Sequence, residues 1–436
     1  MQAKIALILL LLLPAISIGQ DVLTAEDAIA VGLKYNYNIR IARNNARIAE
    51  KNANKGLSGF LPTLDVSGNY QLSTTTEETN SPFSFGDSDT RNLTGQIALN
   101  WTLFDGFRMF INKSRYDDLA KLGEYQARNI IENTVVRILQ AYFNLVQQDQ
   151  LLDVARNSME ISRTRLNKEQ VRNELGSASS TDFLNAQVSF NNDRAAFLNQ
   201  ELQVQIARKN LNILLGKSPE TAIEVKKEIT IQPLTMQLEE MLDLVQKRNS
   251  SILLARQDQK IAEQNTQLMR SYFYPNLFLN SSYSITDRSI SSQNPQFSRD
   301  IETQSKGAAA GLTLSFNLFN GFQDKIDLQN ARLEQQNSEL ALKDIQNQIE
   351  GLVREKFTTF EKQMELVVLE MENVTAAEQN LELQQDRYQI GASSSLEFRD
   401  AQVNLTRAQS VLISARYQAR ITRLEIEQLT GNLELQ

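Results

Sequence analysis

The sequence repeats itself once along most of its length. Three pairs of identical residues lie 213 positions apart, and four further pairs lie 215 positions apart. The first set is Asn36 and Asn249, Pro62 and Pro275, and Tyr70 and Tyr283; the second is Gly106 and Gly321, Gly176 and Gly391, Ala186 and Ala401, and Gly216 and Gly431. A constant spacing indicates a duplicated structural unit. We therefore predict a first repeat over 20–216, a connector over 217–235, a second repeat over 236–431 and a C-terminal tail over 432–436.

Each repeat contains two segments in which apolar and polar residues alternate, the pattern of a β-strand with one apolar face. The predicted strands cover 63–73, 92–103, 276–286 and 308–318. The two residues by which the spacings differ fall between the strands of each pair, in the polar segments 74–91 and 287–306. Exposed loops tolerate such differences in length, so each pair is expected to form a hairpin.

Long helices are predicted between the hairpins. The segments 107–175 and 322–390 each lack proline and contain a single glycine, Gly123 and Gly351 respectively. Each reads as one helix of about 70 residues, on the order of 105 Å long. Apolar residues recur in them at alternating spacings of three and four, which is typical of coiled coils. Helices over 181–215 and 395–429 follow, and shorter helices over 24–35 and 37–57 precede the first strand.

The first nineteen residues have the pattern of a secretory signal peptide. Lys4 precedes an apolar run over 5–13, and the small residues Ser17 and Gly19 stand before Gln20. The run is too short to cross a bilayer as a helix, so we predict a cleaved leader at 1–19. The alternative is an N-terminal helix packed in a core.

The absence of cysteine and histidine excludes most catalytic chemistry. The chain has no residue of either type, so it has no disulfide, no histidine-dependent triad and no zinc site of the usual ligands. We predict no metal, no cofactor and no enzymatic activity, although catalysis by carboxylates alone stays formally open. Removing Lys4 with the leader changes the net charge from −7 to −8, which argues against a nucleic-acid partner.

The strands are long enough to span a membrane. Nothing after residue 20 has the pattern of a membrane helix, and strands of about 10–11 residues with one apolar face match tilted membrane strands. Four strands cannot close a barrel, whose smallest membrane form has about eight, so several copies would have to join. Three copies would supply twelve strands. The alternative is a pair of amphipathic hairpins on a soluble core.

Two kinds of motif give the chain a family resemblance. The strand-to-helix segments are WTLFDGF (101–107) and FNLFNGF (316–322), and the interhelical turns are RNELGSASSTDFLNAQ (172–187) and RYQIGASSSLEFRDAQ (387–402). With the duplicated plan of hairpins and long helices, they resemble TolC-type outer membrane efflux proteins. The resemblance implies a mixed α and β fold of two tandem repeats. In this fold a homotrimer joins a twelve-stranded outer membrane β-barrel to a periplasmic α-barrel of twelve helices.

The same resemblance implies a function and a set of partners. The protein would conduct substrates passively across the outer membrane of a Gram-negative bacterium, with a long periplasmic extension. It would receive them from a periplasmic adaptor and an inner membrane pump of the RND, ABC or MFS class. Outer membrane lipid would surround the barrel.

Candidate functional residues also follow from the resemblance. The gate or constriction at the periplasmic end would comprise Thr181, Asp182, Tyr388, Glu397 and Asp400, with a link between Tyr388 and Asp182 and an acidic ring from Glu397 and Asp400. The adaptor would contact Arg172, Leu175, Gly176, Arg387 and Gly391. The strand-to-helix junctions would use Phe104, Gly106, Phe319 and Gly321. Gly176 and Gly391 are the tip glycines, one in each interhelical turn. The family pattern has an arginine two places after the second of them, whereas this chain has Ser393.

Simpler explanations exist for several of these residues. Asp182 and Glu397 each lie three residues after a serine, so they also match the helix-capping box. Asp400 would otherwise be a solvated surface acid, and the two tip glycines would simply end helices. The rival functions are a periplasmic coiled-coil adaptor or scaffold, which has no use for membrane-length strands, and a carboxylate-based hydrolase.

Overall fold

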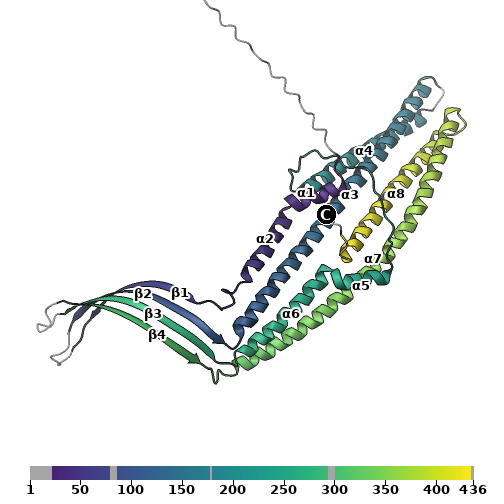
Figure 1. The fold of residues 1–436 in the computed structure, drawn as a ribbon. Coiled ribbons are helices and arrows are strands. Elements are labelled where there is room, and N and C mark those ends of the chain that lie inside the picture. Colours follow the sequence, from purple (N-terminus) through teal and green to yellow (C-terminus); the bar gives the residue numbers. More distant parts are fainter. Residues whose placement is uncertain (1–21, 79–85, 177–178, 293–299, 434–436) are drawn as a thin grey trace, which may run out of the picture. The chain divides into compact units, whose positions relative to one another are not determined.

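The computed structural model describes residues 22–78, 86–176, 179–292 and 300–433. The predicted leader at 1–19 lies outside these residues. The chain divides into two compact units (Figure 1). Unit 1 comprises 1–41, 130–245 and 349–436, and unit 2 comprises 42–129 and 246–348. Three continuous helices contribute residues to both units: α2 (Tyr37–Asn52), α3 (Arg108–Glu174) and α7 (Gln323–Gln389).

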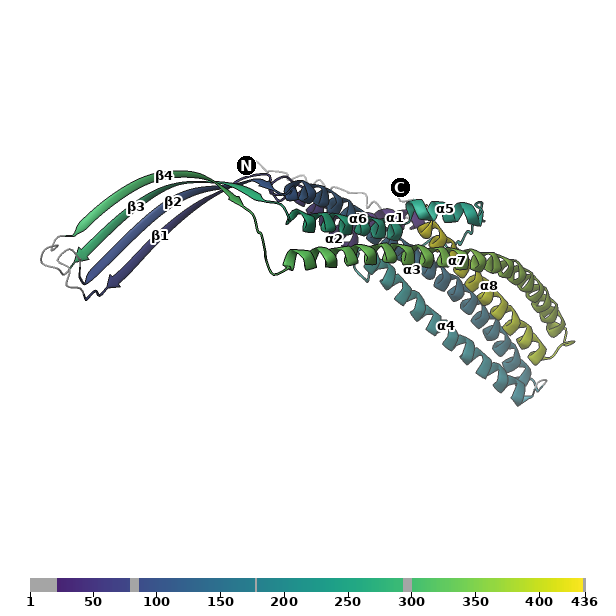
Figure 2. The same ribbon diagram turned by 90° about the horizontal axis from the view of Figure 1, so that it is seen from below.

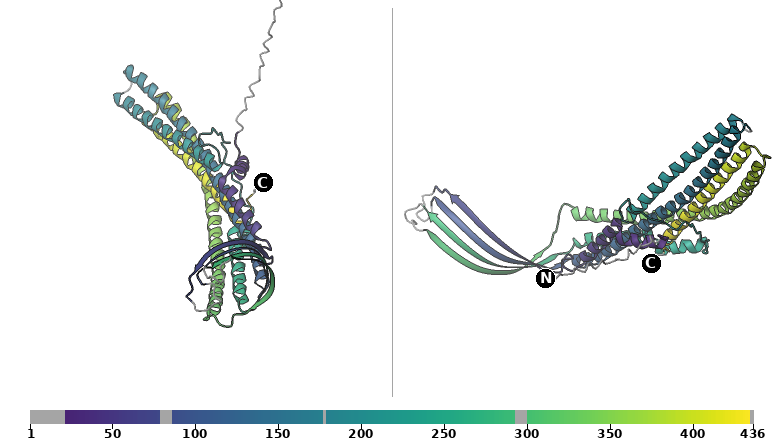
Figure 3. Two further views of the ribbon diagram at one scale, coloured as in Figure 1. Left: turned by 90° about the vertical axis from the view of Figure 1, so that its left-hand side faces the viewer. Right: turned by 90° about the horizontal axis from the view of Figure 1, so that it is seen from above.

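Unit 2 contains one antiparallel sheet made of two hairpins. Its strands are β1 (Thr63–Thr75), β2 (Ser88–Asp105), β3 (Asn276–Ser292) and β4 (Ile301–Ser315), in the order β1-β2-β3-β4. The first repeat supplies β1 and β2, and the second supplies β3 and β4. The sheet is curved, as the end-on view in Figure 3 shows. Within the chain, β1 and β4 are edge strands and each pairs on one side only.

The register gives the sheet one apolar and one polar face. Val66 pairs with Ile97, and Ile97 pairs with Tyr283, so the three side chains share a face. The opposite face carries a row of polar residues from all four strands, Gln71, Asn92, Arg288 and Thr303. On this face lies a polar hollow of about 410 Å³, lined by these four residues and by Ser73, Thr90, Thr286 and Ser305.

The fourth strand ends earlier than its sequence pattern predicted. We expected a strand over 308–318, but β4 ends at Ser315, which pairs with Asn276 at the very start of β3. Residues 316–318 therefore have no partner on β3. In contrast, β2 continues to Asp105 because it pairs with β3 up to that residue. All four strands extend beyond their predicted bounds at the end nearer the interstrand loop, and β4 begins at Ile301 rather than at 308.

The helices of unit 2 lie side by side in the order α2, α3, α6 (Ser250–Ser271) and α7. A Cβ placed on Gly123 of α3 would lie 2.8 Å from the Cβ of Ala49, so glycine allows α2 to approach α3 closely. Asp118 of α3 accepts a hydrogen bond from Lys260 of α6 at 2.8 Å, and Thr266 of α6 donates to the carbonyl of Ala331 of α7 at 3.2 Å.

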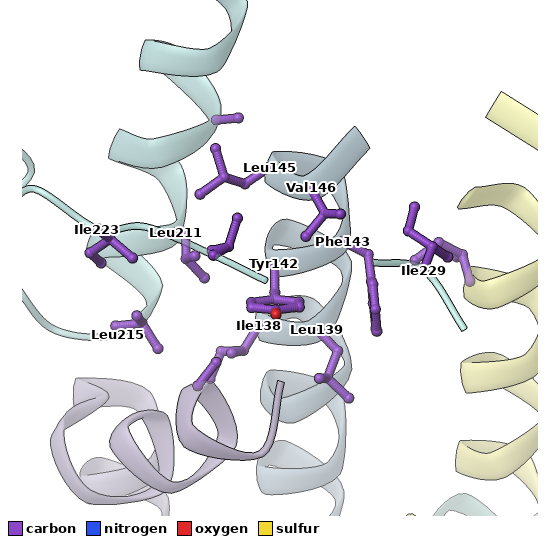
Figure 4. Packing of buried hydrophobic residues seen from close by; sticks show 14 of the residues in the cluster. Ile138, Leu139, Tyr142, Phe143, Leu145, Val146, Leu211, Leu215, Ile223 and Ile229 are labelled. Atoms are coloured by element: carbon purple, nitrogen blue, oxygen red, sulfur yellow. The ribbon is translucent and has the colours of Figure 1, made fainter. Parts of the chain in front are cut away.

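Unit 1 has the main hydrophobic core. Residues of α3 from Val135 to Val146 pack against α1 (Ala25–Tyr35), α4 (Ser180–Leu214), the connector and α8 (Ser395–Leu429) (Figure 4). Thr24 caps α1 in a reciprocal capping box with Asp27. A Cβ on Gly32 would lie 2.3 Å from Cδ1 of Ile138, so α1 approaches α3 closely at this glycine. The short helix α5 (Leu238–Arg248) follows the connector.

Beyond this hydrophobic core, the long helices of unit 1 form two hairpins, α3 with α4 and α7 with α8 (Figure 2). Gln200 of α4 donates to the carbonyl of Gln148 of α3 at 3.0 Å, and Lys356 of α7 pairs with Glu425 of α8 at 2.8 Å. The bounds of α3, α4 and α7 each differ from the predicted ones by one residue at each end, and α8 has the predicted bounds. The predicted helix over 37–57 is shorter, because α2 ends at Asn52. Among the described residues, no helix combines the length and apolar character needed to cross a membrane.

Candidate functional site

Both strand-to-helix junctions have the same unusual backbone. Gly106 and Phe107 have φ values of 69° and 70°, and Gly321 and Phe322 have φ values of 70° and 67°. A phenylalanine in this left-handed region is uncommon, so two such residues at equivalent positions indicate a turn that the fold requires. In each junction the two phenylalanines contact edge to face, with ring centroids 5.2 Å apart for Phe104 and Phe107 and 5.3 Å apart for Phe319 and Phe322.

The surroundings of the two junctions differ. A Cβ on Gly106 would lie 2.4 Å from the carbonyl oxygen of Ser271 and 2.8 Å from the Cβ of Tyr274. For Gly321, no described atom lies within 4 Å of that position. The first junction thus packs against the segment that enters β3, while the second is open in the single chain.

The predicted tip residues lie at the turns between the paired helices of unit 1. At the second turn, the amide of Ala392 donates to the carbonyl of Arg387 at 2.8 Å, and Gly391 has φ 78°. These features end α7 in a Schellman-type cap, which needs a left-handed residue. At the first turn Gly176 has φ 68°, and Leu175 is 76% exposed. Arg172 of α3 pairs with Glu169 at 3.3 Å.

Glu397 completes a reciprocal capping box with Ser394 at the start of α8, whereas at the start of α4 the side chain of Ser179 supplies the cap. The hydroxyl of Ser179 donates to Asp182 at 2.8 Å, and the amide of Ser394 donates to Glu397 at 2.7 Å. Hydrogen bonds from the Ser394 amide and from neighbouring serine hydroxyls lower the pKa of Glu397. Both acids lie near helix N-termini, where a negative charge is also favoured by the helix dipole. Thr181 and Asp400 are exposed.

Tyr388 is buried at the tip and does not contact Asp182 in this chain. Its hydroxyl donates a hydrogen bond to Glu169 of α3, and its ring stacks on Phe398 with centroids 5.2 Å apart. Lys168 lies over the same ring, 4.2 Å from its centroid. Burial and the hydrogen bond to Glu169 raise the pKa of Tyr388. Because Asp182 is bonded to its own helix cap, the Tyr388–Asp182 link stays a prediction for the assembled protein.

A buried polar network lies beside Tyr388, and the sequence analysis missed it. Arg399 of α8 donates to both carboxylate oxygens of Asp193 of α4, with Nη2 2.8 Å from Oδ1. The Ser162 hydroxyl of α3 also donates to Asp193, and Gln402 of α8 donates to the carbonyl of Ser158 at 2.7 Å. Arg165 of α3 donates to the carbonyl of Ser395 at 3.4 Å. The network therefore connects α3, α4 and α8.

A signal for this network is present in the sequence. The residues 215 positions from Asp193, Arg399 and Ser162 are Ala408, Leu184 and Ala377. Charged and polar residues thus stand in one repeat where the other has apolar ones. Such differences between equivalent positions indicate that the two repeats have different packing partners there.

The tip residues and the buried polar network are suited to mechanical and electrostatic functions rather than to catalysis. In the described part of the chain, no group of three or more metal-binding side chains comes together. Glu397 and Asp400 lie three residues apart on α8, so both project from nearly the same helical face. The turn region can therefore present negative charge, while the buried network fixes how the two helical hairpins pack.

Comparison with known proteins identifies relatives along most of the chain. The family model described as "Outer membrane efflux protein" matches residues 32–217 and 241–432. The outer membrane protein TolC of Escherichia coli K12 is 23% identical over 390 residues, which cover 88% of this chain and 77% of TolC. The alkaline protease secretion protein AprF of Pseudomonas aeruginosa is 27% identical over 313 residues, covering 69% of this chain and 63% of AprF.

Solved structures share the fold at low sequence identity. The CmeC outer membrane channel of Campylobacter jejuni superposes with a TM-score of 0.80 at 14% identity, covering 94% of this chain and 85% of CmeC. The outer membrane protein VceC of Vibrio cholerae gives a TM-score of 0.76 at 18% identity, covering 93% of this chain and 96% of VceC. The family match falls in two stretches, as expected for a duplicated chain.

Proposed function

Because the chain belongs to the outer membrane efflux protein family, we propose that it is the outer membrane channel of a tripartite efflux or type I secretion system. It conducts substrates passively from an inner membrane pump and a periplasmic adaptor to the cell exterior. Members of this family are channels and not enzymes, in agreement with the absence of cysteine and histidine from the chain.

The observation that carries this proposal is the two-faced sheet. On β2 the apolar face extends from Leu93 to Leu103. At about 3.3 Å per residue and a tilt near 40°, these ten steps rise about 25 Å, the height of the apolar band on outer membrane barrels. The opposite face is polar and hollowed, as the lining of an aqueous passage would be.

Unpaired surfaces at both ends of unit 2 support closure by further copies. Ile261 of α6 is 9% exposed, whereas Ile48, its equivalent 213 positions earlier on α2, is 58% exposed. Leu333 of α7 is 57% exposed, whereas its equivalent Asp118 on α3 is 3% exposed. Helix α3 of the first repeat packs on α6 of the second. The equivalent helices, α7 and α2, make no such contact within the described part of one chain. A second copy that placed its α2 against α7 would supply that contact.

The edges of the sheet and the open junction at Gly321 are also surfaces that a second copy would cover. The edges of β4 and β1 would pair between copies, and the segment Ser58–Leu61 of one copy would pack on Gly321 of the next. Ser58 and Leu61 are the repeat equivalents of Ser271 and Tyr274, which pack on Gly106. Head-to-tail contacts of this kind either close into rings or grow into filaments. We infer a ring of three copies, in which three sheets of four strands form a twelve-stranded barrel.

The tips of the helical hairpins are the proposed contact region for the adaptor. Leu175 and Ile390 expose large apolar side chains beside Gly176 and Gly391. Arg172 and Arg387 lie three residues before these apolar residues in the sequence. In the trimer, Glu397 and Asp400 would give six carboxylates around the axis. They form the proposed constriction, together with Thr181, Asp182 and Tyr388.

The test is to express the full-length chain in a Gram-negative host and to follow its location, assembly and conductance. We expect it in the outer membrane fraction, extractable only with detergent and running as a trimer on native gels. In planar lipid bilayers the purified trimer should conduct ions. Recovery as a freely soluble periplasmic protein would instead support the adaptor or scaffold function.

A further inference from the structure

The polar hollow on the sheet of unit 2 is built around one cation. Arg288 of β3 lies in its central row, between Asn92 of β2 and Thr303 of β4. The other lining side chains carry a hydroxyl or an amide, and these neutral groups can donate hydrogen bonds to an anion. All of the lining residues belong to one chain, so each copy contains a complete hollow.

Arg288 is far from any acid on its own face of the sheet. Among residues 63–75, 88–102, 276–292 and 301–315 of the described strands, it is the only cation on the polar face, and Asp65 is the only acid. Asp65 is level with Ser282, six residues from Arg288 along β3. That stretch spans about 20 Å, roughly twice the screening length at about 0.1 M salt. Arg288 is exposed, so its charge is available to a ligand.

A second observation at the hollow concerns Asn92. Its side-chain oxygen is buried and forms no hydrogen bond with any residue that the structure describes. Buried polar atoms normally have a partner, and Asn92 pairs directly with Arg288 in the sheet. The Asn92 amide can therefore bind a group held by Arg288, accepting from its hydroxyl or, when turned over, donating to its oxygens.

The duplication gives one such cation per chain. The residue 213 positions before Arg288 is Thr75, which is neutral. In the proposed trimer, three Arg288 side chains would therefore ring the lumen. Arg288 lies four residues before the end of β3 at Ser292, so the ring would be near the end of the barrel that carries the interstrand loops.

We propose that the polar hollow is a binding site for the carboxylate or phosphate groups of molecules that pass through the barrel. This inference rests on the proposed trimeric channel. A guanidinium forms paired hydrogen bonds with either group, and the surrounding hydroxyls and amides supply further donors. The three sites place positive charge near the outer mouth of the channel, opposite in sign to Glu397 and Asp400 at the other end.

The chain contains a matched control for Arg288. Arg91 of β2 pairs with Ser289, the residue after Arg288, so its side chain projects from the opposite face of the sheet. Arg288→Gln and Arg91→Gln therefore remove the same charge at nearly the same height, one from the lumen and one from the lipid side. Arg288→Lys keeps the charge but loses the two-pronged geometry.

The test compares these variants with the wild type as purified full-length trimers in planar bilayers, at about 0.1 M salt so that screening stays weak. The reversal potential in a KCl gradient reports the preference between K⁺ and Cl⁻. Citrate and pyrophosphate, added separately to both chambers, are the probes for carboxylate and phosphate binding. Native gels show whether each variant assembles.

We expect both probes to reduce the wild-type conductance. Arg288→Gln should need roughly tenfold more of either probe for the same reduction, because a charged hydrogen-bond donor is lost. Its reversal potential should also shift toward that of K⁺. Arg91→Gln should match the wild type in both measurements, and Arg288→Lys should keep the reversal potential while its block by the probes weakens.

Three results would overturn the anion site: no reduction of the wild-type conductance by either probe, unchanged block in Arg288→Gln, or an equal effect of Arg91→Gln. If Arg288→Gln assembled poorly, unchanged block in Arg288→Lys would overturn the site instead. Block by only one probe would support the site and identify the group that it binds. A wild-type protein that forms no conducting trimer would contradict the proposed channel itself, so the two failures are distinguishable.

Discussion

The guanidinium of Arg399 on α8 binds the carboxylate of Asp193 on α4, with Nη2 2.8 Å from Oδ1 and both side chains mostly buried. Removing one partner leaves the other charge buried and unpaired, so Arg399→Leu should lower the local free energy of opening by about 3 kcal/mol. That loss corresponds to roughly a hundredfold faster hydrogen exchange. Amides of α4 around Asp193 are the place to measure it.

Two variants control this measurement. Arg407→Leu removes an exposed arginine from the same helix and should change exchange little. The double variant Asp193→Leu with Arg399→Leu leaves no unpaired charge, so it should recover part of the lost protection. Equal exchange in the Arg399→Leu and Arg407→Leu proteins would show that the pair contributes nothing to packing.

The course of the chain was predictable because its signals are long and repeated. The bounds of α8 match the prediction, and Asp105-Gly106 and Asn320-Gly321 interrupt alternation just before long helical periodicity begins. The end of β4 was not predictable, because alternation continues to Leu318 while its partner strand begins only at Asn276. The Tyr388–Glu169 contact was also hidden, since a hydrogen bond between residues 219 positions apart depends on how helices pack.

Alanine at the two junction glycines tests ring closure. Both glycines have φ near 70°, so a Cβ costs about 1 kcal/mol of strain at either position. Gly106→Ala also clashes with the Ser271 carbonyl, whereas Gly321→Ala meets open space in the single chain. If Ser58–Leu61 of a neighbouring copy fills that space, both variants should reduce the yield of trimers on native gels severely. The control Gly311→Ala, at a position with neither positive φ nor close neighbours, should assemble normally. Normal assembly of Gly321→Ala would contradict the proposed contact.

Asp118 should make the packing of α3 on α6 sensitive to acid. Burial by itself raises the pKa of Asp118, but hydrogen bonds from Lys260 and Gln264 outweigh it, and the net pKa is lowered. A lowered folded pKa means that the stabilisation is complete above the unfolded value, about 3.9, and is lost as pH falls through the folded value. The thermal unfolding midpoint of the wild type, followed by helical circular dichroism, should therefore decrease as the pH is lowered below about 4. The drop should be smaller in Asp118→Asn, which starts from a lower midpoint at pH 7. If the thermal midpoints of the wild type and Asp118→Asn depend on pH in the same way, Asp118 does not make this packing sensitive to acid.

Neighbouring residues on β2 test which face of the sheet meets lipid. Ile97 and Gln96 are adjacent and therefore point to opposite faces. Arginine at Ile97 would lie in the apolar band and should cost about 2–4 kcal/mol per subunit, while arginine at Gln96 would face the polar hollow side. We expect Ile97→Arg to lower the amount of trimer in the outer membrane strongly and Gln96→Arg to leave it near the wild-type level. The reverse order would invert the assignment of the two faces.

The acids at the start of α8 should contribute unequally to cation block. The carboxylate of Glu397 accepts hydrogen bonds from the amide and hydroxyl of Ser394 and from the hydroxyl of Ser393. Its negative charge is thus partly engaged in capping, whereas Asp400 is exposed and belongs to no cap. Asp400→Asn should weaken block of the trimer's conductance by divalent cations several-fold, and Glu397→Gln should weaken it less while loosening the first turn of α8 by about 1 kcal/mol. Block is measured in planar bilayers at low salt, because at 1 M salt screening over about 3 Å would hide the difference. Full block in the double variant Glu397→Gln with Asp400→Asn would place the constriction elsewhere.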